Sequence, residues 1–251
     1  MKKKRLIARL DIKNQFVIKG IHLEGLRKIG DPIELAKQYY EGGIDEIIFM
    51  DAVASLYGRN NLFHIIENAC KEVFIPITIG GGLKSIEDID LALKSGADKV
   101  AVNTAGIRNP KFIEEASLKY GSQCIVGSIE AKKKSWGYEA YVETGREESG
   151  VDVMEWAKKL EDLGAGELFI TSIDKDGTKK GFDTELISKV MEVVHIPVIG
   201  CGGAGKLSHF SELMSKSDVD AVSTGSFLHY KLGSIADIKN HLAEHQIAVR
   251  A

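Results

Sequence analysis

The sequence predicts a (β/α)8 TIM barrel built from two similar halves, and three observations support this fold. Short apolar runs of strand length alternate with amphipathic stretches of helix length along the chain. The chain has 251 residues, a common length for this barrel. The segment Ile75-Pro-Ile-Thr-Ile-Gly-Gly-Gly82 returns 121 residues later as Ile196-Pro-Val-Ile-Gly-Cys-Gly-Gly203. A repeat with four βα units in each half favours closure, because each half then covers the edge strands of the other.

The expected elements follow from this alternation in chain order. The predicted strands are Leu6–Leu10, Glu46–Met50, Ile77–Ile79, Lys99–Val102, Cys124–Ile129, Glu167–Thr171, Val198–Gly200 and Ala221–Ser223. The predicted helices are Pro32–Tyr40, Leu62–Val73, Ile86–Lys94, Pro110–Lys119, Val153–Leu163, Thr184–Val194, Leu207–Ser215 and Ile235–His245. Two long segments, Lys13–Gly30 and Lys132–Gly150, are predicted as loops in equivalent places of the two halves, and loops of this length are usually functional.

Composition limits the classes of protein to which the chain could belong. No linker separates the halves, so we expect one domain over 1–251, with half-barrels at about 1–120 and 121–251. The net charge of −3 argues against partners such as nucleic acid or a membrane surface. The basic start lacks the apolar core of a signal peptide, and no apolar run is long enough to span a membrane. Three scattered cysteines predict reduced thiols in a cytoplasmic protein, and we expect no metal and no cofactor.

Two carboxylic side chains end equivalent strands of the predicted halves. Asp11 closes the first strand and Glu130 closes the fifth, so a closed barrel places them on opposite sides of one mouth. Burial and mutual repulsion separate the pKa values of two such groups, which suits them to general acid and base roles. Capping of a neighbouring loop is the alternative for each. Asp51 and Asp176 follow the second and sixth strands and face the same mouth.

The repeated glycine turns indicate anion sites. A strand that ends on paired glycines brings several backbone N–H groups together, which suits a phosphate. The same offset aligns Asn103-Thr104-Ala105 with Thr224-Gly225-Ser226, so each half would carry one cradle.

Charged residues begin four of the predicted strands at the opposite end of the barrel. They are two cations and two anions: Arg5, Glu46, Lys99 and Glu167. The sequence leaves open whether they form a salt-bridge ring that seals the base or a polar gate.

These residues and their order resemble the cyclase subunit of imidazole glycerol phosphate synthase along essentially the whole chain. The resemblance is carried by ordered blocks, among them Leu10-Asp-Ile-Lys13, Val17-Ile-Lys-Gly20, Gly96-Ala-Asp-Lys-Val100, Asp174-Lys-Asp-Gly-Thr178 and Gly202-Gly-Ala-Gly205. It implies a barrel that receives ammonia from a separate glutaminase subunit. The implied reaction closes an imidazole ring on a ribonucleotide with a phosphate at each end and yields imidazole glycerol phosphate and AICAR in histidine biosynthesis.

The resemblance also implies roles for single residues. Asp11 and Glu130 would be the acid–base pair, and Lys19 would lie on a mobile loop over the site. The implied substrate-binding residues are Lys19, Asp51, Gly82, Asn103, Thr104, Asp176, Gly177, Gly203, Gly225 and Ser226. One phosphate would bind at Gly82, Asn103 and Thr104, and the other at Gly177, Gly203, Gly225 and Ser226. Arg5, Glu46, Lys99 and Glu167 would form the ammonia gate, and Asp98 and Gln123 would lie on the face that docks the glutaminase.

Four positions depart from the pattern of this family. Arg9, Glu130, Cys201 and Gly225 stand where the cyclase usually has Cys, Asp, Ser and Ala. A buried guanidinium at position 9 needs a carboxylate, either Glu130 or Asp11. Pairing with Glu130 would make Glu130 a poor base and leave the proton transfers to Asp11.

Three hypotheses on function follow. The first is the histidine-pathway cyclase. The second is a paralogous ammonia-channelling synthase that amidates a sugar for surface polysaccharide; Gly127-Ser-Ile-Glu130 and Trp136-Gly137 resemble that branch. The third is a weakly catalytic scaffold that activates a glutaminase, and retention of both carboxylates argues against it.

Overall fold

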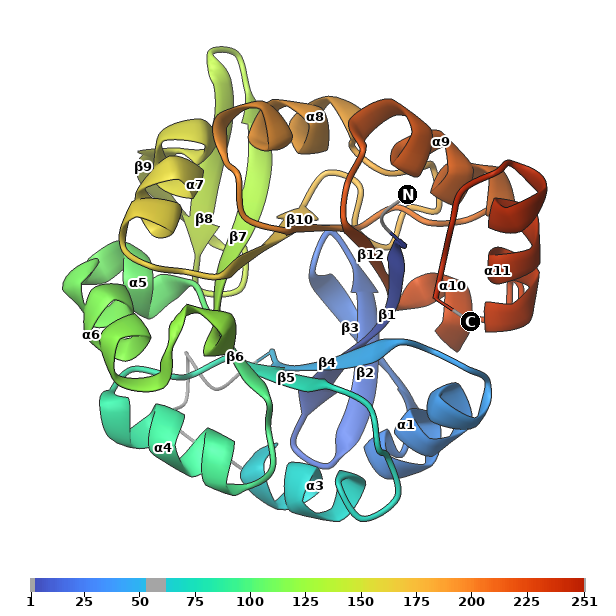
Figure 1. Cartoon of the computed structure of the whole chain (residues 1–251), viewed down its shortest axis with the longest axis horizontal. Coiled ribbons are helices and arrows are strands. Elements are labelled where there is room, and N and C mark those ends of the chain that lie inside the picture. Colours follow the sequence, from blue (N-terminus) through green and yellow to red (C-terminus); the bar gives the residue numbers. More distant parts are fainter. Residues whose placement is uncertain (1–2, 53–61, 251) are drawn as a thin grey trace.

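The computed structural model describes residues 3–52 and 62–250, which form a closed β-barrel surrounded by helices (Figure 1). The eight parallel barrel strands of this part of the chain are β1 (Arg5–Lys13), β4 (Glu46–Asp51), β5 (Ile77–Gly80), β6 (Lys99–Val102), β7 (Ile125–Lys134), β10 (Glu167–Ser172), β11 (Val198–Cys201) and β12 (Ala221–Thr224). Their order is β10-β11-β12-β1-β4-β5-β6-β7, and β7 pairs with β10 to close the ring. The predicted TIM barrel is therefore confirmed.

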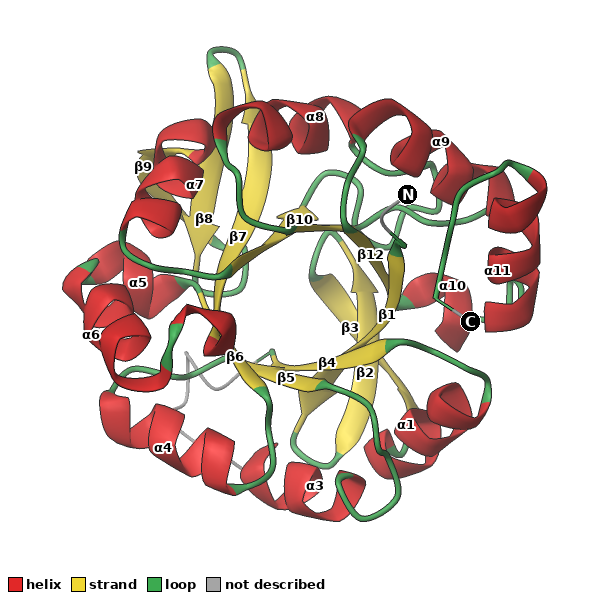
Figure 2. Cartoon of the chain, in the orientation of Figure 1, coloured by secondary structure: helices red, strands yellow, loops and turns green. Residues whose placement is uncertain are grey.

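Helices follow the strands and cover the outside of the barrel (Figure 2). The longer ones are α1 (Pro32–Glu41), α3 (Leu62–Ala69), α4 (Ile86–Lys94), α6 (Lys111–Tyr120), α7 (Val153–Asp162), α8 (Thr184–Val193), α9 (Leu207–Ser217) and α11 (Ile235–Glu244). Short helices α5 (Thr104–Arg108), α10 (Ser226–His229) and the 3-10 turn η1 (Ser122–Cys124) lie between them. The prediction that the second helix reaches Val73 was wrong, because Lys71 and Glu72 bond to carbonyls three residues back and end the helix as a turn.

The repeat of the sequence is also a repeat of the structure. Strands β4 and β10 start and end 121 residues apart, as the sequence offset requires. The first full helix of each half begins at an aspartate with the same offset. Asp31 accepts hydrogen bonds from the backbone N–H groups of Ile33 and Glu34, and Asp152 accepts from the two equivalent groups of α7.

The two segments predicted as long loops are instead antiparallel hairpins. β1 continues to Lys13 and turns back into β2 (Phe16–Ile21) and β3 (Glu24–Gly30). β7 likewise continues to Lys134 and turns back into β8 (Gly137–Val142) and β9 (Glu147–Asp152). Their charged, glycine-containing sequences have no strand-like side-chain pattern. They form strands because their backbone N–H and C=O groups pair with the extended ends of β1 and β7.

Side chains of the barrel strands alternate between an outer and an inner face. On β1, Leu6, Ala8 and Leu10 join the large core between barrel and helices. A separate apolar cluster fills the inside of the barrel, and its members are Ile7, Ile48, Met50, Ala101, Val126, Phe169, Ile199, Cys201 and Ala221. In the described residues no helix combines the length and the apolar character that a membrane span requires.

Candidate active site

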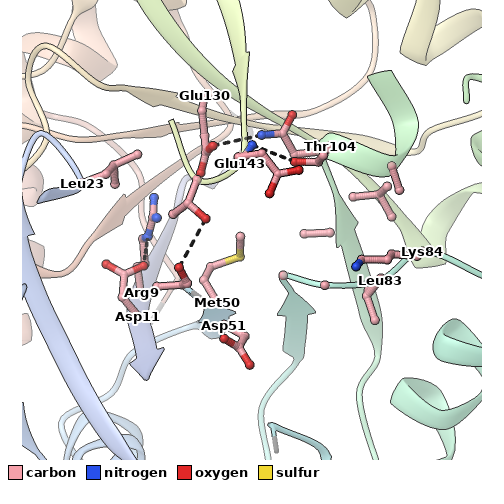
Figure 3. A pocket seen from close by; sticks show the side chains of 18 of the residues that line it. Arg9, Asp11, Leu23, Met50, Asp51, Leu83, Lys84, Thr104, Glu130 and Glu143 are labelled. Carbon is pink, nitrogen blue, oxygen red and sulfur yellow. Dashed lines mark hydrogen bonds and ion pairs between the residues drawn. The ribbon is translucent and has the colours of Figure 1, made fainter. Parts of the chain in front are cut away.

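A cavity of about 270 Å³ opens where the barrel strands end at their carboxyl termini. Four of the expected carboxylates line it: Asp11, Asp51, Glu130 and Asp176. Figure 3 shows Arg9 and Asp11 together, with Glu130 apart from them and toward Thr104 and Glu143. The mouth of the barrel therefore brings together the candidate acid–base residues of both halves, at the end where this fold holds its active sites.

Asp11 is bound by two cations. Its Oδ1 accepts a hydrogen bond from Arg9 Nε at 2.7 Å, and its Oδ2 accepts one from Lys19 Nζ at 3.1 Å. Lys19 also bonds both carboxylate oxygens of Asp176, at 2.9 and 3.0 Å. Burial favours the neutral form of Asp11, but Arg9 and Lys19 outweigh it and hold the pKa of Asp11 well below its usual range. Asp11 is thus a permanent anion at neutral pH.

Glu130 has the opposite environment. It is 5% exposed, and its Oε2 accepts a hydrogen bond from the Asn103 amide at 3.0 Å. Burial raises the pKa of Glu130 to about 7, against the opposing effect of Arg9 and with a further rise from the negative charge of Asp11. A carboxyl group with this pKa exchanges protons readily near neutral pH, so Glu130 meets the main requirement of a general acid or base.

The partner of Arg9 is Asp11 and not Glu130. Arg9 is 2% exposed, and its guanidinium donates from Nε to Asp11 and from Nη1 to Thr171 Oγ1 at 2.9 Å. The hypothesis that Glu130 forms an ion pair with Arg9 was therefore wrong. Arg9 and Asp11 are two residues apart on the same face of β1, so their side chains are neighbours. Glu130 lies across the mouth, on β7.

Lys19 does not lie on a loop. It belongs to β2, is 2% exposed, and ties the first hairpin to Asp176 beyond β10. The hairpin and the segment after β10 meet closely, since a Cβ on Gly177 would lie 2.2 Å from the carbonyl oxygen of Gly20. Gly177 also has a φ of 72°. The position therefore favours glycine both because a side chain would clash with Gly20 and because the backbone is left-handed there.

Of the two expected phosphate cradles, the first lines the cavity. Its lining includes Gly81, Gly82, Asn103 and Thr104, and both glycines have positive φ. The Asn103 amide is turned to Glu130 and to the carbonyl of Tyr141, while its Oδ1 is buried without a hydrogen-bond partner among the described residues.

The second cradle lies outside the lining of this cavity, whose residues do not include Gly177, Gly203, Gly225 or Ser226. Gly203 has a φ of 110°, and α10 begins at Ser226. The Ser226 hydroxyl is buried and unpaired within the described part of the chain. An unpaired buried hydroxyl fits a site that is completed by a ligand.

The four charged residues at the strand starts form one ring of ion pairs. Arg5 bonds Glu46 at 2.8 Å and Glu167 at 2.5 Å, and Lys99 bonds the same two carboxylates at 3.2 and 2.8 Å. The ring lies below the apolar cluster that fills the barrel. Asp98 and Gln123 are exposed near this end, and Asp98 Oδ2 accepts a hydrogen bond from the backbone N–H of Ile77 at 2.8 Å.

Residues 5–234 match the family model described as "Histidine biosynthesis protein". The chain belongs to the histidine biosynthesis protein family. A Legionella pneumophila relative named "Imidazole glycerol phosphate synthase subunit HisF" is 55% identical over 208 residues, which are 82% of this chain and 98% of the relative. Relatives of the same name from Lactococcus lactis subsp. lactis (strain IL1403) and Clostridium botulinum (strain Okra / Type B1) are 47% and 45% identical over 249 residues, 98% of this chain and 96% and 98% of theirs.

For this member of the histidine biosynthesis family, the structure adds site residues that the sequence did not indicate. Glu143 and Arg108 line the cavity and form an ion pair at 2.8 Å, and Lys84 lines it beside the first glycine turn. Glu143 has a φ of 51° at the turn between β8 and β9, and its backbone N–H donates to Thr104 Oγ1. No sequence signal indicated these residues. Glu143 reaches the cavity only because the second hairpin folds over the mouth, and Arg108 is recognised only through its ion pair with Glu143.

The described residues of this family member hold no group of three or more His, Cys, Asp or Glu side chains suited to a metal ion. Cys70, Cys124 and Cys201 are free thiols. Burial raises the pKa of the Cys201 thiol, so it remains protonated beside Arg9.

Proposed function

We propose that this chain is the cyclase subunit of imidazole glycerol phosphate synthase. In this role it uses ammonia from a glutaminase partner to close an imidazole ring on a bis-phosphorylated ribonucleotide, and it releases imidazole glycerol phosphate and AICAR. The observation that carries the proposal is the pair of carboxylates at the mouth. Asp11 is held ionised by two cations, whereas Glu130 has a pKa of about 7.

The two carboxylates divide the work of ring closure. Glu130 accepts and returns protons, because its charged and neutral forms are both populated near pH 7. Asp11 stays negative and stabilises positive charge that develops on nitrogen when ammonia attacks and water leaves. General acid–base catalysis of this kind contributes about 10²–10⁴-fold to a rate.

The two cradles hold the two phosphates of the substrate in this proposal. The first cradle borders the cavity at Gly82, Asn103 and Thr104, and the unpaired Ser226 hydroxyl supports the second. Asp51, Asp176 and Lys19 line the space between the ends. A substrate fixed at both ends keeps its reacting carbon over Glu130 and Asp11, and such positioning contributes strongly to rate.

Ammonia enters at the opposite end of the barrel in this proposal. The ring of Arg5, Glu46, Lys99 and Glu167 is the gate, and Asp98 and Gln123 belong to the face on which the glutaminase docks. The exposed positions of both residues near the ring support this role.

A specific observation favours a second candidate, an ammonia-channelling synthase that amidates a sugar. Arg9 occupies one oxygen of Asp11 and fills part of the inner end of the cavity. A site with one anchored anion and one titratable carboxylate is also sufficient to add ammonia to an activated carbon of a sugar.

The decisive experiment supplies the purified chain with the histidine-pathway nucleotide and an ammonium salt, and follows AICAR. Under our proposal product forms without the glutaminase, and the gene restores growth without histidine to a strain that lacks its own cyclase. Absence of product in a protein that binds the nucleotide would reject the cyclase and leave the sugar synthase. If the chain activates a glutaminase but consumes neither the histidine-pathway nucleotide nor a sugar, the scaffold hypothesis would remain.

A further inference from the structure

The inside of the barrel is layered from the ring to the cavity. Successive inward residues of β1 are Arg5 in the ring, Ile7 in the apolar cluster, then Arg9 and Asp11. β10 repeats the order with Glu167 in the ring, Phe169 in the cluster and then Thr171, which meets Arg9. A small molecule travelling from the ring to Asp11 therefore passes the apolar cluster and reaches Arg9 before it reaches the cavity.

Arg9 lies across the inside of the barrel at this level. It starts on β1 and bonds Thr171 on β10, three places away around the ring of strands, and its Nη1 lies 3.7 Å from Cys201 Sγ on β11. Its guanidinium carbon stands 5.5 Å from the centre of the Phe169 ring, whose face it covers. Below it the residues are apolar, and above it is the cavity that Arg9 itself lines.

The same layer contains a hydroxyl that has no partner within the described chain. Ser223 is fully buried on β12, in register with Cys201, and its Oγ makes no hydrogen bond to the described residues. Cys201, the strand neighbour of Ser223, lies 3.7 Å from Arg9 Nη1. Buried hydroxyls are normally satisfied, so an unpaired one next to this cysteine indicates a place for a small polar molecule. Arg9 offers N–H donors beyond those it uses on Asp11 and Thr171, because a guanidinium has five.

We propose that Arg9, Thr171 and Ser223 form a charge-selective station that holds neutral ammonia directly below Asp11 and rejects ammonium. This inference rests on the proposed use of ammonia. Ammonia accepts one hydrogen bond, from the guanidinium, and donates to the two hydroxyl oxygens. Ammonium has no lone pair to accept that bond, and the fixed positive charge of Arg9 repels it. Only the nucleophilic form then passes upward to the reacting carbon.

Thallium(I), a monovalent ion close to ammonium in size, is the probe for a crystallographic test that does not depend on activity. Crystals of the unaltered protein and of Arg9→Met are soaked in a thallium(I) salt, which enters through the open cavity, and anomalous maps are compared. We expect no thallium below Asp11 in the unaltered protein and a bound ion between Asp11 and Thr171 in Arg9→Met. Arg9→Lys keeps the charge and should also exclude the ion, and Lys13→Met removes an exposed cation from the same strand as a matched control.

Thallium bound between Asp11 and Thr171 in the unaltered protein, or its absence from a folded Arg9→Met, would contradict the proposal of a charge-selective station. A second measurement follows turnover from ammonium salt at constant free ammonia while potassium is raised. Arg9→Met should be inhibited at potassium concentrations at least about tenfold lower than the unaltered protein, and equal inhibition contradicts the proposal. Absence of all turnover in every variant would reject the proposed function, whereas the thallium maps would still decide the charge selectivity.

Discussion

Replacing Glu130 with glutamine should stabilise the protein at alkaline pH while removing its activity. Glutamine keeps an oxygen that accepts the Asn103 hydrogen bond but carries no charge. A carboxyl whose pKa rises from 4.5 to about 7 on folding destabilises the folded state when it ionises. The folded state binds the proton more tightly than the unfolded chain does, so the stability of the unaltered protein falls as pH rises from about 4.5 to 7.

The size of this effect follows from the two pKa values. One pKa unit corresponds to about 1.36 kcal/mol, so the cost of ionising Glu130 approaches about 3 kcal/mol above pH 7. Only a small part of this cost is present at pH 5. The free energy of unfolding of Glu130→Gln relative to the unaltered protein should therefore increase by about 2 kcal/mol between pH 5 and pH 8.

Urea unfolding at the two pH values measures this difference directly. Glu115→Gln, which removes an exposed glutamate from α6, is the matched control and should show no such change with pH. In parallel, ammonia-dependent turnover of Glu130→Gln should fall by about 10²–10⁴-fold. A stability difference that is the same at pH 5 and pH 8 would refute the raised pKa, and with it the assignment of Glu130 as the proton-transfer group.

Three further predictions test other parts of the molecule. Asp98→Asn keeps an acceptor for the Ile77 N–H but loses the charge, so it should lower glutaminase-coupled turnover while turnover with free ammonia is retained; equal loss in both assays would place Asp98 in folding or chemistry. Gly203→Ala puts a Cβ 2.0 Å from the carbonyl oxygen of Gly181 at a φ of 110°. The melting temperature of this variant should fall, and its affinity for phosphate in a titration should drop. Normal stability would show that the turn can relax. Asp152→Ala removes the cap of α7 and should cost about 1 kcal/mol in urea unfolding, as should the equivalent Asp31→Ala, and a cost confined to one half would contradict the structural repeat.

Much of the fold and of the site could be predicted because the relevant signals are local. Apolar runs and amphipathic periods located the barrel strands, and Pro32 after Asp31 located a helix start. The carboxyl ends of parallel strands meet at one mouth, so Asp11 and Glu130 could be placed in a common cavity before any contact was known. The hairpins could not be predicted in this way, because β2 and β8 are stable as strands only against the extended ends of β1 and β7.

The sequence alone determined which groups face the inside of the barrel, since side-chain direction alternates along a strand and the repeat fixes which strands are equivalent. It did not determine which of those groups pair. Arg9 had two carboxylates as possible partners, and only the strand register and barrel closure show that it bonds Asp11 and reaches Thr171. That choice leaves Glu130 buried without a directly bonded cation among the described residues, and burial raises its pKa to about 7. The protonation of the site is therefore a tertiary property, because burial and the distances between charges exist only in the closed barrel.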